Sequence, residues 1–196
     1  MRRLILRLIL ILHAASALPA SAAPTAYALQ QDQSRVGFSY MLAGIPAKGA
    51  MPVLSAEILI DTKRLERSSV DVKVDVTRAR AGFIIATEAL KSPSVLNAVR
   101  YPQIRFRSTG IRLNGQGRLS DGAQIDGQLT VRGVTLPVTL QAALYRPADT
   151  APDDLRRLRF SLSGQVSRTA FGAAGYSGLV DDLVTLRITA YVEKKD

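Results

Sequence analysis

The sequence predicts an all-β fold, an antiparallel eight-stranded barrel with one short helical segment between two strands. Three observations lead to this fold. Apolar and polar residues alternate in segment after segment, as they do in strands that bury only one face. Two of these segments join at Arg132-Gly133 to form a hairpin within residues 124–146. The segments number eight or nine, and a sheet of that size leaves unprotected edges unless it closes on itself.

The predicted hairpin is the clearest part of the pattern. Ile125, Leu129 and Val131 alternate with polar residues, and the glycine at the turn allows the positive φ that tight hairpins need. From Val70 to Val76, valines alternate with polar residues, which suits a half-buried pleated surface. In chain order, strands are expected at residues 27–31, 35–40, 56–60, 70–77, 104–113, 124–131, 134–144, 158–166 and 186–192.

Several segments interrupt the alternation. Residues 41–54 contain two Gly and two Pro, which predicts a loop or a bulged edge. Residues 82–90 lack alternation and predict one or two helical turns. Ser92-Pro93 has the form of an N-cap followed by proline in the first helical position, which predicts a short helix through Leu96. Residues 147–154 and 170–182 are expected to form a polar loop and a Gly-rich loop.

The first 22 residues have the three parts of a cleaved secretory signal. Arg2, Arg3 and Arg7 precede an apolar run over residues 8–18, and Ala20-Ser21-Ala22 provides small residues for cleavage. The apolar run is shorter than the roughly 20 residues that cross a bilayer, so an uncleaved anchor is the lesser alternative. We therefore expect residues 1–22 to be a signal peptide and residues 23–196 to form one exported domain.

The composition narrows the chemistry of that domain. Cleavage would remove His13, the only histidine, and the chain has no Cys. No imidazole or thiol would remain for nucleophilic catalysis or for a zinc site, so we expect neither a metal nor a catalytic residue. Cleavage would also leave 23 of the 26 Lys and Arg residues against 16 Asp and Glu, a balance that favours anionic partners such as a membrane surface. Nucleic acid is not expected, because basic runs with interleaved aromatic residues are missing.

The alternation alone leaves the interior of the barrel undecided. At about eight strands, side chains can fill the interior or leave room for one small ligand. The inward residues are mostly Val, Ile and Leu, and only 6% of the chain is aromatic, which is compatible with either outcome.

Several segments, in one consistent order, resemble a known family. The most specific are the run G-x-L-T-x-x-G-V-T-x-P-V-x-L over residues 127–140 and the R-T-x-F-G sequence over residues 168–172. Further matching segments are residues 33–38, 58–61, 90–93 and 101–108. With these segments the chain resembles the YceI-like proteins, exported bacterial lipocalin-like barrels associated with polyisoprenoid binding. The resemblance covers nearly the whole exported domain and implies a periplasmic protein. Where family members often carry polar residues that include histidine, this chain reads Met41–Gly44 and Thr87–Leu90.

The resemblance implies an apolar ligand, either an isoprenoid lipid or the tail of a quinone, and no other cofactor. The inward rows expected to line its cavity are Phe38, Tyr40, Ile58, Ile60, Val72, Val74, Ile104, Phe106, Leu129 and Phe160. Phe83, Ile85, Leu90 and Leu96, together with Ile84, are expected to form either a lid or mouth or a plug packed over the end of the barrel, and Phe171 completes the predicted set. Arg168 is interpreted mainly as structural, and Arg105 and Arg107 as solvated surface or contacts for anionic head groups.

Two other functions remain open from the sequence. The first is a fully packed barrel that acts through its basic surface as a structural or stress protein of the cell envelope. The second, and the weaker, is an enzyme that uses only tyrosine, arginine and carboxylates. The pattern is also compatible with either a monomer or a homodimer.

Overall fold

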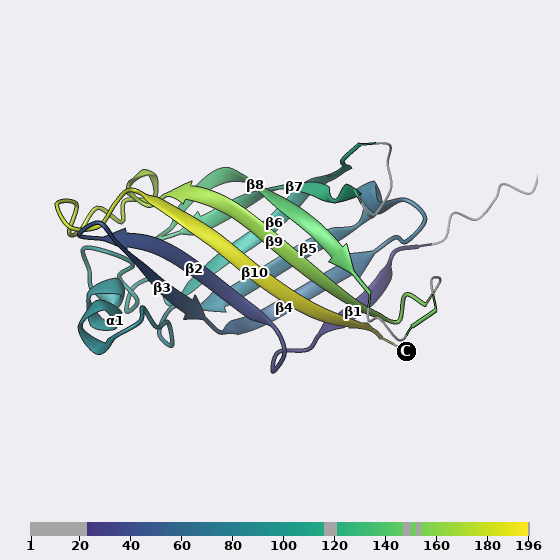
Figure 1. Ribbon diagram of the computed structural model, residues 1–196, viewed down its shortest axis with the longest axis horizontal. Coiled ribbons are helices and arrows are strands. Elements are labelled where there is room, and N and C mark those ends of the chain that lie inside the picture. Colours follow the sequence, from purple (N-terminus) through teal and green to yellow (C-terminus); the bar gives the residue numbers. More distant parts are fainter. Residues whose placement is uncertain (1–22, 116–120, 147–149, 152–153, 196) are drawn as a thin grey trace, which may run out of the picture.

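The computed structural model describes residues 23–115, 121–146, 150–151 and 154–195, which form a closed antiparallel β-barrel (Figure 1). The predicted signal peptide, residues 1–22, lies outside the described residues. The strands are β1 (Thr25–Leu29), β2 (Arg35–Leu42), β3 (Ile45–Met51), β4 (Val53–Ile60), β5 (Ser69–Asp75), β6 (Gln103–Leu113), β7 (Ala123–Val131), β8 (Val134–Tyr145), β9 (Arg157–Ser167) and β10 (Leu183–Lys194). The helical elements are α1 (Ile84–Lys91) and the short 3-10 turns Leu65–Arg67 and Thr169–Phe171.

The ring contains eight strands, in the order β1-β4-β5-β6-β7-β8-β9-β10, and the pairing of β1 with β10 closes it. β10 has two partners on this side: its residues 192–194 pair with β1 and its residues 185–189 pair with β2. β1 and β2, which a turn joins, therefore lie one after the other along the same side of β10. β3 pairs with β2 and continues into β4, which pairs with β1. The predicted all-β class, antiparallel pairing and eight-stranded closure are confirmed.

The prediction of a loop over residues 41–54 was wrong, although an edge was the stated alternative. β2 runs on to Leu42, Ala43 and Gly44 form a turn with φ of 50° and 77°, and β3 follows at once. β3 tolerates its Gly and Pro because it pairs along its length with β2 only. On its other side the pairing described is the single bridge between Ala50 and Arg80, and proline is found mainly on such edges.

The helix predicted from Ser92 to Leu96 is absent, and the helical turns predicted before it are present as α1. Ser92 ends α1 instead of starting a helix: its backbone is extended, with ψ of 160°, and its hydroxyl donates to the carbonyl of Ala89. A residue that precedes proline is driven out of the helical region, so Pro93 terminates the helix. Residues 93–96 form turns.

The connections place α1 at one end of the barrel, which we call the α1 end (Figure 1). The β2–β3 turn, the long β5–β6 connection that contains α1, the β7–β8 turn and the β9–β10 loop all lie there. The β7–β8 turn is held to the β5–β6 connection, since Arg132 donates to the carbonyls of Pro93 and Val95. Arg132 and Gly133 have φ of 52° and 79°, as the predicted tight hairpin requires. None of the helices in the described part of the chain has the length and hydrophobicity that a membrane crossing needs.

Candidate functional site

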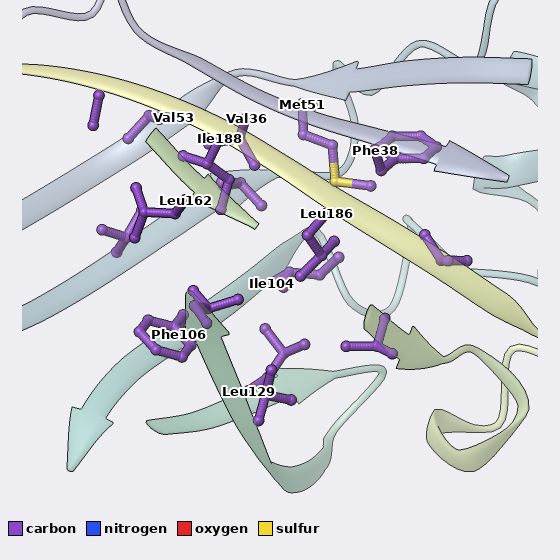
Figure 2. Close-up of a pocket in the computed structure, with 18 of the residues that line it drawn as sticks. Val36, Phe38, Met51, Val53, Ile104, Phe106, Leu129, Leu162, Leu186 and Ile188 are labelled. Carbon is purple, nitrogen blue, oxygen red and sulfur yellow. The ribbon is translucent and has the colours of Figure 1, made fainter. Parts of the chain in front are cut away.

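The interior of the barrel holds an apolar cavity of about 500 Å³. The side chains that Figure 2 labels point into this shared space from strands on all sides of the ring. β2 contributes Val36 and Phe38, β6 contributes Ile104 and Phe106, and β10 contributes Leu186 and Ile188. Alternation brings them together, because every second side chain of each strand faces the interior of a barrel.

The burial of the inward rows shows where the empty space lies. At the α1 end, Val76, Leu96 and Phe171 belong to a buried apolar cluster. At the opposite end, Tyr27 and Leu158 belong to a second buried cluster. Other inward side chains, such as those of Phe38, Phe106, Leu162, Leu186 and Ile188, are only partly buried, because part of their surface faces the cavity and not another side chain.

Two glycines help to keep this space open. A Cβ at Gly49 would lie 2.1 Å from Cζ of Phe38, which is its cross-strand partner. A Cβ at Gly127 would likewise lie 2.5 Å from Cζ of Phe106. Each phenyl ring therefore lies against the bare backbone of the neighbouring strand, and a larger residue at either position would force the ring to move.

The polar groups of Tyr40 and Arg168 on the cavity wall have protein partners. The Tyr40 hydroxyl donates to the carbonyl of Ala81 at 3.1 Å, and burial raises the pKa of this tyrosine. The Arg168 guanidinium is buried and donates to the carbonyls of Gly175, Val180 and Asp181 at 2.8–3.0 Å, and to that of Ala173. Arg168 thus holds the β9–β10 loop in place, in agreement with its structural interpretation. In the described part of the chain, no group of three or more His, Cys, Asp or Glu side chains could hold a metal ion.

All fifteen predicted site residues contribute to the cavity wall. They are Phe38, Tyr40, Ile58, Ile60, Val72, Val74, Phe83, Ile85, Leu90, Leu96, Ile104, Phe106, Leu129, Phe160 and Phe171. Ile84, which was expected beside them in the lid or mouth, is 82% exposed and is not part of the wall. That these residues bind lipid remains a prediction.

The prediction missed part of the wall. Leu162, Leu186 and Ile188 follow the same alternation as the predicted residues, so period two alone would have found them. Met51 and Val53 lie in the segment that was predicted as a loop, and their inward direction follows only from the pairing of β3 and β4.

The mouth of the cavity lies at the α1 end. Phe83, Ile85, Tyr176 and Leu179 are at least half exposed, yet they also line the cavity. Phe83 and Ile85 come from the start of α1, and the other two come from the β9–β10 loop. This loop is fixed beside the β2–β3 turn, where the amide of Ala43 donates to the carbonyl of Leu179 at 2.7 Å.

The outer wall carries a charged cluster on neighbouring strands. Asp71 of β5 accepts hydrogen bonds from Nε of Arg105 at 2.8 Å and from Nε of Arg107 at 3.1 Å. The hydrogen bonds from Arg105, followed by those from Arg107, lower the pKa of Asp71 to about 2. Both predicted surface arginines therefore form ion pairs on the wall, which leaves them less available for anionic head groups.

The fold and the cavity define the chain as a closed antiparallel β-barrel with an apolar chamber. The model of the YceI-like domain family matches residues 27–192, and the chain belongs to this family. The chain is 32% identical to protein YceI of Escherichia coli over 111 residues, which are 57% of this chain and 55% of that protein. It therefore spans only about half the length of the curated relatives that it matches.

Solved structures share the fold. BcnA of Burkholderia cenocepacia superposes with a TM-score of 0.73 at 20% identity, over 84% of this chain and 99% of that protein. A polyisoprenoid binding domain from Saccharophagus degradans, implicated in plant cell wall breakdown, superposes with a TM-score of 0.62 at 11% identity, over 87% and 99% of the two chains. At these identities the likeness establishes the fold of the chain and not its ligand.

Proposed function

We propose that the chain is an exported, non-enzymatic lipid-binding protein of the periplasm that holds an isoprenoid-type ligand, a polyisoprenoid or a quinone tail, inside its barrel. The observation that carries this proposal is the cavity of about 500 Å³ with an almost wholly apolar wall. Membership of the YceI-like family supports it, as does the fold shared with a polyisoprenoid binding domain. The signal-like pattern of residues 1–22 supports export.

An isoprenoid suits this wall because its binding requires contact and not recognition by polar groups. Burial of apolar surface is worth about 0.8 kcal/mol per CH₂, so a five-carbon isoprene unit can contribute roughly 4 kcal/mol before ordering costs. The hydroxyl of Tyr40 and the donors of Arg168 already bond backbone carbonyls. The polar head of the ligand would therefore stay at the mouth, where water and exposed side chains can solvate it.

A carrier of this kind takes up and releases its ligand at a membrane, by peripheral contact with an anionic surface. It has no need of catalytic residues or of a metal. It can work as a monomer or as a homodimer, and the wall that the proposal relies on comes from one chain.

The test is native mass spectrometry of residues 23–196, purified from the periplasm without detergent. We expect a bound apolar ligand that hexane extraction removes, and rebinding of added geranylgeraniol by the extracted protein. Ile104→Trp, which fills the cavity, should abolish rebinding. Leu59→Trp, on the outer face of β4, is the matched control and should rebind.

Failure of the extracted wild-type protein to bind geranylgeraniol would overturn the proposal. It would favour the alternative of an envelope protein that acts through its basic surface. Equal binding by folded Ile104→Trp protein would show that the ligand lies elsewhere.

A further inference from the structure

Exposed apolar side chains gather around the mouth of the cavity. Large apolar residues on the surface of a soluble domain are normal when scattered, but a contiguous group marks an interaction site. Here they come from the β2–β3 turn, the start of α1 and the β9–β10 loop. These three elements lie at the same end of the barrel (Figure 1). We call this group the mouth surface, and it consists of Ile45, Phe83, Ile84, Ile85, Tyr176 and Leu179.

The residues of the mouth surface fall into two groups, those that also line the cavity and those that do not. Phe83, Ile85, Tyr176 and Leu179 reach the cavity as well as solvent, so their exposure follows from the opening itself. Ile45 and Ile84 are 68% and 82% exposed and do not line the cavity. Neither the packing of the barrel nor the lining of the cavity uses these two side chains, so they are available for contact with a partner outside the protein.

Two cations flank the mouth surface. Arg80, three residues before Phe83, is joined to β3 by two backbone hydrogen bonds with Ala50, each 2.9 Å long, and the carbonyl of Lys48 lies 3.5 Å from the position that a Cβ would take at Gly82. Both side chains are exposed, and among the described residues neither has a carboxylate within ion-pair distance. An anionic partner would therefore not have to break an existing ion pair.

The carboxylates at this end are arranged differently. Glu88 of α1 pairs with Lys91 at 3.6 Å. Asp182 accepts hydrogen bonds from the amide and hydroxyl of Thr169 at 2.9 and 2.6 Å, and with Asp181 it lines a separate depression beside Thr169. The apolar tip formed by the start of α1 is thus bordered by the two cations on the side of β3.

We propose that the mouth surface docks on an anionic lipid bilayer, with Ile45, Ile84 and their neighbours in the interface and Lys48 and Arg80 against the head groups. Apolar side chains with adjacent Lys and Arg form the combination that binds such interfaces. Docking in this orientation would place the mouth against the acyl chains, so an apolar ligand would pass between membrane and cavity without crossing water. The transfer step rests on the proposed function, whereas docking itself does not.

The experiment is flotation of residues 23–196, after hexane extraction, with two kinds of vesicle. One consists of phosphatidylcholine alone, and the other also contains about 30% of the anionic lipid phosphatidylglycerol. We expect binding to the anionic vesicles that falls with added salt. Ile45→Ser with Ile84→Ser should weaken it about tenfold or more, because two aliphatic side chains are lost from the interface. Lys48→Gln with Arg80→Gln should weaken it roughly fivefold for each cation removed.

The matched control is Leu54→Ser with Leu59→Ser, which removes two exposed aliphatic side chains from the outer face of β4, away from the mouth. This variant should bind vesicles within about twofold of wild type. The docking proposal would be overturned if the Ile45/Ile84 variant and the Leu54/Leu59 variant lost vesicle binding equally. It would also be overturned if wild type did not bind anionic vesicles. So would a dimer in light scattering that the Ile45 and Ile84 changes convert to a monomer, because a second copy would then cover the mouth surface.

Geranylgeraniol binding by the same variants separates the two proposals. None of the four aliphatic residues lines the cavity, so both variants should bind geranylgeraniol as wild type does. Vesicle binding without geranylgeraniol binding would contradict the proposed function only. Geranylgeraniol binding without vesicle binding would contradict docking only.

Discussion

Both ends of the barrel bury an apolar cluster, but at the α1 end large apolar side chains are also exposed beside the cavity. At the end opposite α1, Tyr27 and Leu158 are 2% and 3% exposed and pack together with Ile58, Ile60 and Val192. At the α1 end, Ile84 and Ile85 are 82% and 78% exposed. Side chains from the strands pack together at the first end, whereas a helix and a loop border the mouth at the second.

The connections explain the difference. At the end opposite α1, the β4–β5 turn is short and tightly bonded: Asp61 accepts the amides of Lys63 and Arg64, each at 3.0 Å. The Tyr27 hydroxyl also fixes the chain before β9, since it donates to the carbonyl of Leu155 at 2.9 Å. At the α1 end, the β5–β6 connection is long enough to carry a helix of its own, and its apolar residues do not all find partners in the barrel. Among the described residues, the packing is therefore tighter at the end opposite α1, and the opening of the cavity lies at the α1 end.

The largest expected effect is a contrast between two truncations. Leu158→Ala, at the packed end, should lower the free energy of unfolding by about 3 kcal/mol, because it leaves a void among buried neighbours. Ile85→Ala, at the mouth, should lower it by less than about 0.5 kcal/mol, since the side chain is mostly in water. Urea unfolding followed by circular dichroism measures both, and it suits a chain without tryptophan. Equal losses would refute the contrast between the ends.

An intermediate effect is expected from the arginine that orders the mouth. Arg168→Met keeps the length of the side chain but leaves the carbonyls of the β9–β10 loop without their donor, which should cost about 2 kcal/mol. Amide hydrogen exchange should rise in residues 173–182 and stay unchanged around Tyr27 at the other end. Arg168→Lys, which retains a charged donor, should recover part of the loss. Unchanged exchange in the loop would show that Arg168 does not hold it.

The smallest expected effect concerns the wall between the ends and depends on pH. The pKa of Asp71 is about 2 in the folded protein, below the ordinary value of about 3.9 for an unfolded chain. Its stabilising contribution is therefore complete above about pH 4 and is lost as the pH falls through about 2.

Because Arg105 and Arg107 are partly solvated, we expect Asp71→Asn to cost only about 1 kcal/mol at pH 7. The difference between wild type and variant should shrink between pH 4 and pH 2 in urea unfolding. In both proteins, Leu158→Ala should still cost more free energy of unfolding than Ile85→Ala. A difference that stayed constant down to pH 2 would mean that the carboxylate is not stabilised by its arginine partners.

Sequence reasoning recovered most of the barrel and of the cavity wall for one physical reason. In a strand, neighbouring side chains point to opposite faces, so Ile104 and Phe106, or Val72 and Val74, must share a face wherever the strand lies. Two segments that interrupt the alternation were harder. Residues 41–54 were expected as a loop, because the packing that makes Gly49 necessary, the ring of Phe38 on the adjacent strand, is not local. Ser92 was expected to start a helix, and only the structure shows that α1 ends there.

The sequence by itself determined that the chain is an antiparallel barrel with apolar side chains turned inward, because alternation is a local property that every strand repeats. Only the tertiary structure decided that the interior is hollow and that it opens at the α1 end. Those features depend on how separate segments of the chain meet: Phe38 of β2 lies against Gly49 of β3, Arg168 holds the β9–β10 loop, and Phe83 and Leu179 line the same cavity. Contacts between different segments fix the volume of the cavity, so the sequence of any one segment does not predict it.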